Sequence, residues 1–60
     1  MIIVRISDKR HQKGFRVKFF EGDVITDEVV EYVKNTPNAF WVQSKNESYY
    51  NREDFLKEWQ

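Results

Sequence analysis

The sequence predicts a small α+β domain in which an antiparallel β-sheet packs on one or two short helices. Two segments near the N-terminus alternate between apolar and polar residues, as half-buried strands do. Two later segments each begin with a residue that favours helix N-termini and continue with acidic residues. Because 60 residues suffice for one domain only, we expect residues 1–60 to form a single compact domain with one core.

The first strand is predicted within "MIIVRIS", residues 1–7. Ile2, Val4 and Ile6 alternate with Ile3 and Arg5, which predicts that the first set faces the core and the second set faces away from it. The following "DKRHQKG" is polar and basic and ends in a glycine, as loops do. We therefore expect this strand to begin a hairpin with a long basic loop.

The second strand is predicted within "FRVKFF", residues 15–20, which alternates in the same way. We place Phe15, Val17 and Phe19 toward the core, and Arg16, Lys18 and Phe20 on the opposite face. The two strands are expected to pair antiparallel.

The segment "FFEGDVITDEVVEYV", residues 19–33, allows two interpretations. In the first, the chain turns at Gly22 and Thr26 then caps a short helix. Asp27 and Glu28 supply negative charge to its first turn, where the helix dipole favours it. The apolar pair Ile25 and Val30 fits a hydrophobic staple. We favour this helix.

In the second interpretation, residues 24–33 are one long strand, because most of them are β-branched or aromatic. The spacing of Gly22, Val29 and Tyr32 resembles that of SH3-like and Sm-like small barrels, which implies a five-stranded barrel with a C-terminal helix. Strict alternation fails, however, because this strand would point Asp27 and Glu31 inward.

The two halves of the chain share a layout at an offset of 25 residues. "FRVKFFEGDVITDEVVEYVKN" aligns without gaps with "FWVQSKNESYYNREDFLKEWQ", so that Thr26 matches Asn51. In the second unit Asn51 and Asp54 fit a capping box, and Tyr50 and Phe55 fit a staple. Each unit reads as strand, turn, short strand and helix, which predicts the order β-β-β-α-β-β-α with short strands near residues 24–25 and 49–50.

A dense apolar core has to stabilise this domain. The sequence contains no cysteine and one histidine, which excludes disulfides and argues against a structural zinc site, but it contains ten aromatic residues. The residues that we expect in the core are Ile2, Val4, Ile6, Phe15, Val17, Phe19, Ile25, Val30, Val33, Phe40, Val42, Tyr50, Phe55, Leu56 and Trp59.

Charge is balanced overall but unevenly distributed. Residues 1–20 carry six basic side chains and one acidic side chain, whereas residues 21–60 carry four basic and nine acidic ones. This asymmetry either marks a binding surface or is neutralised when the two halves pack together. No targeting or membrane-spanning segment is visible, so we expect a cytoplasmic protein without membrane contact.

No arrangement of residues in the sequence indicates catalysis, and we predict that the protein is not an enzyme. There is no cysteine nucleophile, the serines lie in no nucleophile motif, and the two glycines belong to no phosphate-binding loop. His11 lies among polar residues and fits a solvated surface position. The acidic residues of the two helical segments have the spacing of helix surfaces. We expect no cofactor and no metal.

We therefore expect a small binding protein that acts as a regulator, inhibitor or adaptor through a protein partner, of a kind that bacteria and their viruses commonly encode. If the strand at residue 41 joins the hairpin in one sheet, an uncovered face combines aromatic and cationic groups, which are typical of interaction hot spots. The alternative is a nucleic-acid-binding module in which the basic hairpin contacts phosphates and Phe20 and Trp41 stack on bases. A homodimer formed through this face or a sheet edge is a third prospect. The candidate partner-binding residues are Arg5, Arg16, Lys18, Phe20 and Trp41.

Overall fold

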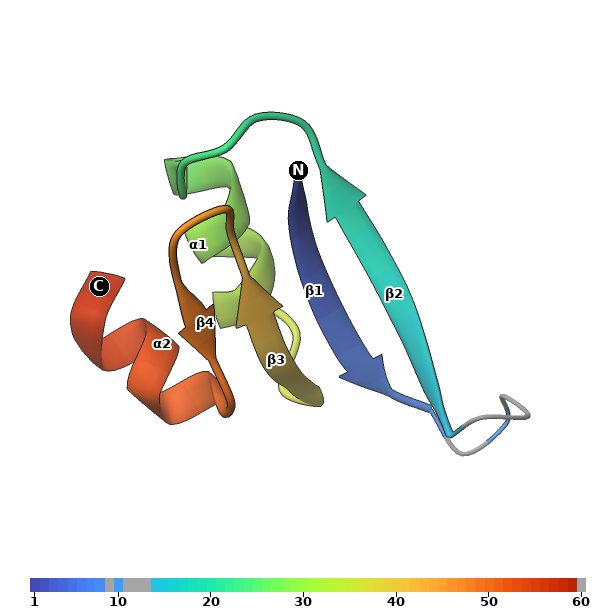
Figure 1. Cartoon of the computed structure of the whole chain (residues 1–60). Helices are drawn as coiled ribbons and strands as arrows, with labels where there is room; N and C mark the ends of the chain where they lie inside the picture. The colour runs from blue at the N-terminus through green and yellow to red at the C-terminus, as the bar shows by residue number, and fades with distance from the viewer. Residues whose placement is uncertain (9, 11–13, 60) are drawn as a thin grey trace.

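The protein forms a four-stranded antiparallel sheet with two short helices on one face, as seen in a computed structural model that describes residues 1–8, 10 and 14–59 (Figure 1). The α+β class predicted from the sequence is confirmed. The strand order in the sheet is β2-β1-β3-β4, so the N-terminal strand is central. The elements are β1 (Ile2–Ser7), β2 (Phe15–Phe20), α1 (Asp27–Lys34), β3 (Ala39–Gln43), β4 (Ser48–Tyr49) and α2 (Arg52–Trp59).

Residues 27–34 form a helix, so the prediction of a helix in this segment is confirmed and the five-stranded barrel is wrong. Val29 and Val33, four residues apart, lie on one helical face and are fully buried. Thr26 occupies the N-cap position in an extended conformation, but its side chain makes no capping hydrogen bond. The acidic first turn therefore provides the local stabilisation of this helix end.

The short strand predicted near residues 24–25 is absent. Residues 21–26, all of which the structure describes, form bends and irregular backbone between β2 and α1. Gly22 allows this irregular backbone because its φ of 100° is one that other residues rarely adopt. Ile25 is nevertheless buried, so this connection contributes to the core without pairing in the sheet.

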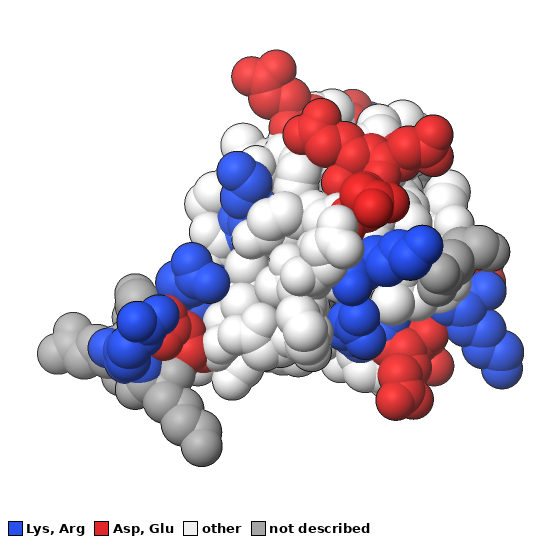
Figure 2. Space-filling model, turned by 180° about the vertical axis from the view of Figure 1, so that it is seen from behind, with Lys and Arg blue, Asp and Glu red and all other residues white. Residues whose placement is uncertain are grey.

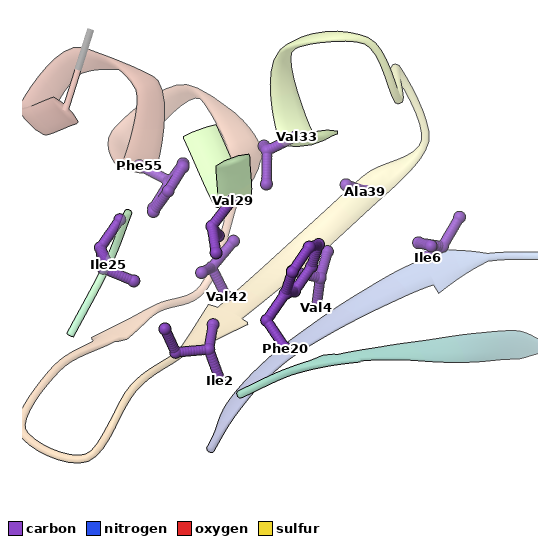
Figure 3. Close-up of a cluster of buried hydrophobic side chains, with 10 residues drawn as sticks. All are labelled: Ile2, Val4, Ile6, Phe20, Ile25, Val29, Val33, Ala39, Val42 and Phe55. Carbon is purple, nitrogen blue, oxygen red and sulfur yellow. The ribbon is translucent and has the colours of Figure 1, made fainter. Parts of the chain in front are cut away.

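The core lies between the helices and one face of the sheet, called here the covered face. Figure 3 shows Val29 and Val33 of α1 and Phe55 of α2 pointing toward Val4 of β1 and Val42 of β3. The buried cluster consists of Ile2, Val4, Ile6, Phe20, Ile25, Val29, Val33, Ala39, Val42 and Phe55. Seven of these were predicted as core residues, whereas Phe20, Val29 and Ala39 were not.

The prediction for β2 has the right alternation but the wrong phase. Ile2 pairs with Phe20, and Val4 pairs with Lys18, so Phe20, Lys18 and Arg16 lie on the covered face. Phe15, Val17 and Phe19 lie on the other face, and none of them is in the buried core. Alternation gives two sets of residues, but the pairing register decides which set faces the helices.

Two further core predictions, one in β3 and one just after β4, are wrong. A register irregularity opposite Arg5 and Ile6 places Ala39 in the core and leaves Phe40 exposed. Val42 is buried as expected. Beyond β4, Tyr50 is 70% exposed instead of completing a staple.

The C-terminal helix begins as the sequence predicts. Asn51 Oδ1 accepts a hydrogen bond from the Asp54 backbone N–H at 2.7 Å, and Asn51 Nδ2 donates to the Asp54 carboxylate at 3.0 Å. Phe55 is fully buried, but Trp59, predicted for the core, is 37% exposed. The two helices begin 25 positions apart, so the repeated layout holds for them but not for the missing short strand.

The two helices are also tied to one another. The Arg52 guanidinium donates to the backbone carbonyls of Val33 and Lys34 at 3.2 and 2.9 Å. These carbonyls are at the end of α1, where the helix leaves its acceptors without internal partners. The first residue of α2 therefore caps the last turn of α1 and fixes both helices over the same face.

Candidate interaction surface

The sheet face opposite the helices carries large apolar side chains that no described part of the chain covers. We call it the open face. Phe19 is 57% exposed there, and Tyr50, at its β4 end, is 70% exposed. Large exposed apolar patches are rare on isolated monomers and often mark interaction sites. The residues that form the open face are Ile3, Arg5, Ser7, Phe15, Val17, Phe19, Phe40, Trp41, Gln43, Ser48 and Tyr50.

Arg5 and Trp41 occupy the centre of the open face, on neighbouring strands in direct register. The Arg5 guanidinium carbon lies 4.2 Å from the centre of the Trp41 ring and 5.5 Å from that of Phe15. Arginine over tryptophan is a favourable cation–π arrangement. The Arg5 guanidinium group therefore lies close to two aromatic rings.

Two edge-to-face ring pairs extend this centre in both directions. Trp41 meets Tyr50 at a centroid distance of 5.1 Å, and Phe15 meets Phe40 at 6.1 Å. Edge-to-face packing is a favoured geometry for aromatic pairs. The open face thus presents aromatic side chains from β2 and β3 on either side of Arg5 in β1.

The open face carries a positive charge and no negative one. Arg5 is the one charged residue of the open face as defined above, and no described carboxylate forms a salt bridge with it. Arg5 Nε and Trp41 Nε1 are both buried, and neither has a hydrogen-bond partner among the described residues. Buried donors without acceptors cost free energy, so the monomer maintains this centre at some expense of stability.

The structure separates the five candidate residues into two groups. Arg5 and Trp41 lie together on the open face, as predicted. Arg16, Lys18 and Phe20 lie on the side of β2 that faces the helices, so their predicted place on the uncovered face is wrong.

Each member of the second group has its own local contacts. Phe20 is buried and packs edge-to-face on Tyr32 at 5.4 Å, with the Lys18 ammonium over both rings. Arg16 Nε lies 3.1 Å from the Asp8 carboxylate. The open-face residues that the sequence interpretation missed are Phe15, Val17, Phe19, Phe40 and Tyr50.

The basic and acidic halves of the sequence do not form two poles. Figure 2 shows most of the visible acidic side chains at one end, with lysines and arginines on both flanks of an uncharged area. Asp8 lies among the N-terminal cations. The backbone N–H of Arg10 donates to its carboxylate, and together with the Arg10 and Arg16 guanidinium groups it lowers the pKa of Asp8.

The described residues contain no cluster of three or more histidine, cysteine, aspartate or glutamate side chains suited to a metal ion. His11, predicted as a solvated surface histidine, and the basic residues Lys9 and Lys13 lie outside the described residues. Neither α1 nor α2, the helices of the described ranges, has the length and apolar character that crossing a membrane requires. Comparisons with protein-family models, curated proteins and solved structures gave no significant match.

Proposed function

We propose that this protein is a small, non-enzymatic binding protein that docks a protein partner on its open face. The observation that supports this proposal is the aromatic surface centred on the Arg5–Trp41 pair. Tryptophan, tyrosine and arginine dominate the binding energy of protein interfaces, and here Arg5 and Trp41 lie at the centre of the open face with Tyr50 beside them. A small domain with such a surface suits a role as regulator, inhibitor or adaptor in the cytoplasm.

The charge of the open face defines the chemistry of the partner. Because Arg5 has no carboxylate on this face, we propose that the partner places a carboxylate against it and apolar side chains around it. A second copy of the chain packed face to face would instead bring a second arginine to the same apolar interface. Burying two like charges without an acid is costly, which favours a different protein.

Nucleic acid is the second candidate, because Phe19, Phe40 and Tyr50 are exposed and aromatic rings stack on bases. The version predicted from the sequence loses one of its two stacking residues, since Phe20 is buried beneath Lys18 and beside Tyr32. The open face supplies a single described cation, whereas such binders track phosphates with many. We therefore expect binding of a labelled single-stranded oligonucleotide to stay at background.

A capture experiment with matched variants tests the proposed function. The tagged chain is used to isolate its partner from cells that naturally contain it, and affinity is then measured with the purified partner. Trp41→Ala is expected to cost about 2 kcal/mol or more of binding free energy, a roughly thirtyfold loss of affinity. Tyr50→Ser is expected to weaken binding to a lesser degree, because its ring lies at the side of the centre.

Val24→Ser provides the matched control. Val24 is 68% exposed, close to the 70% of Tyr50, but it lies in the connection between β2 and α1. Its replacement removes an exposed apolar side chain without touching the open face, so affinity should remain unchanged. Equal affinities of the wild type and of a folded Trp41→Ala variant would show that the partner docks elsewhere.

A further inference from the structure

The outer edge of β2 is a six-residue strand edge that no described segment pairs with. At the opposite end of the sheet, β4 has only two residues and so offers little edge. Natural sheets usually shorten, cover or charge their edges, because unpaired backbone groups attract further strands. The edge of β2 is the one long edge of this sheet.

The hydrogen-bond pattern identifies the backbone groups that face outward. The Asp8 N–H donates to the Gly14 carbonyl at 3.0 Å, which makes these two a hydrogen-bonded pair. Such pairs alternate along an antiparallel ladder, so Arg16, Lys18 and Phe20 bond to β1. The N–H and C=O groups of the intervening Phe15, Val17 and Phe19 therefore point away from the sheet.

A groove runs along this edge on the side of the helices, and we call it the edge groove. It consists of two hollows of about 390 and 630 Å³ between β2 and α1, which share Lys18, Phe20 and Glu28. The ring pair of Phe20 and Tyr32 lines the larger hollow. A strand added to β2 would direct every second side chain toward this groove and the others toward Val17 and Phe19.

The charges on β2 disfavour a second copy of the chain as the added strand. Two β2 strands paired antiparallel through their outward groups can place Val17 opposite Phe15, Val17 or Phe19. Each of these registers sets Arg16 or Lys18 directly opposite Arg16 or Lys18 of the other copy. Like charges in directly opposite positions destabilise a strand pair. The same two cations favour acidic residues in a strand from another protein.

We propose that the edge of β2 binds an extended segment of a partner protein as an additional antiparallel strand, with acidic residues opposite Lys18 and Arg16. Arg16 already holds one carboxylate, that of Asp8, at 3.1 Å on this side of the sheet. The position opposite Phe20 takes an uncharged apolar side chain, because Glu21, Glu28 and Glu31 line the groove there and would repel an acid. The positions opposite Val17 and Phe19 take apolar side chains.

Hydrogen exchange of the complete chain with a designed peptide tests this site. The probe is acetylated, amidated VIEVEY, whose residues lie in order opposite Phe20, Phe19, Lys18, Val17, Arg16 and Phe15. In the free protein, the amide protons of Val17 and Phe19 should exchange fast and those of Arg16 and Lys18 slowly. At a peptide concentration of ten times Kd, exchange at Val17 and Phe19 should slow about tenfold.

Two chemical controls leave the protein unchanged. VIKVKY presents lysines to Lys18 and Arg16 and should bind at least tenfold more weakly. N-methylation of the fourth peptide residue removes an N–H that bonds to β2 and should abolish binding, whereas methylation of the third, whose N–H points away, should not. Binding that is indifferent to the site of methylation, or equal for both peptides, overturns the proposal.

Two protein variants complete the test. Val17→Pro removes an outward donor, which edge strands tolerate, and should abolish peptide binding in a folded chain. Trp41→Ala should leave peptide binding unchanged, so failure of the edge site and failure of the open-face proposal are distinguishable. Protection of Val17 and Phe19 that rises with protein concentration without peptide identifies a second copy as the occupant and also overturns the proposal.

Discussion

The two faces of the sheet differ in the kind of apolar residue they carry. The covered face is mainly aliphatic, with Ile2, Val4 and Ile6 of β1 and Val42 of β3 under the helices. The open face is mainly aromatic, with three of the five phenylalanines and Trp41 around Arg5. The aromatic residues of this chain therefore serve its surface more than its core.

The reach of the helices explains the difference. Each helix has eight residues, and their buried side chains contact the middle of the sheet. Phe20, at the end of β2, is the one residue of this strand in the buried core. The remaining covered side of β2 carries Arg16 and Lys18, whose stems lie beside the core while their charges reach water. The part of the covered face that the helices bury is therefore formed mainly by aliphatic side chains.

The largest effect on stability is expected at the covered face. Phe55→Ala should lower the free energy of unfolding by about 3–5 kcal/mol, because Phe55 is fully buried and its loss leaves a cavity between α2 and the sheet. A 60-residue domain has about that much stability in total, so the variant should be largely unfolded at 25 °C. Circular dichroism with urea titration measures this.

Phe40→Ala is the matched control on the open face, where the same side chain is removed from an exposed position. Its cost should stay at about 1 kcal/mol, because Phe40 is 36% exposed and its ring pair with Phe15 lies at the surface. Similar losses for both variants would contradict the division into a core face and an interaction face.

Part of this division was predictable from the sequence. In β1 the polar Arg5 marks the outward set, so the inward set of Ile2, Val4 and Ile6 follows from alternation alone. In β2 both sets contain a large aromatic residue, since Phe19 and Phe20 are adjacent. Local pattern cannot choose between them, and the pairing of Ile2 with Phe20 decides the matter.

The candidate site was predictable to the same extent. Arg5 and Trp41 each lie next to a core residue in their own strand, so alternation predicts that their side chains point away from the core. Strict alternation predicts that Phe40 lies beside Val42 on the core face. The irregularity opposite Arg5 and Ile6 breaks that alternation, and it arises from the pairing of two strands far apart in sequence.

The second effect, of intermediate size, concerns the helices that create the covered face. Asn51→Ala should cost about 1 kcal/mol of unfolding free energy, because Asn51 accepts from the Asp54 N–H and donates to the Asp54 carboxylate. Thr26→Ala, at the corresponding position before α1, should lower the free energy of unfolding by only a few tenths of a kcal/mol, since its side chain makes no capping bond. Urea titrations of both variants check the order, and equal losses would mean that Thr26 caps α1 in solution.

A smaller effect is expected from Tyr49 at the margin of the covered face. Partial burial raises the pKa of Tyr49 above its ordinary value of 10.0, and the Glu47 carboxylate adds to the increase while the Trp59 indole N–H opposes it. A raised pKa in the folded state means that the unfolded chain loses this proton first as pH rises. The free energy of unfolding should therefore begin to fall as the pH rises past about 10, and it should keep falling until the folded protein also loses this proton.

Tyr49→Phe isolates this contribution, because the variant keeps the ring that packs on Phe55 but has no proton to lose. The advantage of the wild type over the variant should shrink as pH rises through this range, measured by urea titration at each pH. A constant difference would show that Tyr49 titrates alike in the folded and unfolded chain.

The smallest effect on stability is expected at the centre of the open face, although the Arg5 Nε is buried there. Arg5→Met should change the free energy of unfolding by no more than about 0.5 kcal/mol. The methionine keeps the apolar stem and its contact with Trp41, and it removes Nε, a buried donor without a partner. Thermal and urea unfolding measure the change. A loss above about 1 kcal/mol would mean that the cation–π contact stabilises the fold itself. A change near zero would mean that the chain retains Arg5 for something other than its own stability, which is what a docking surface requires.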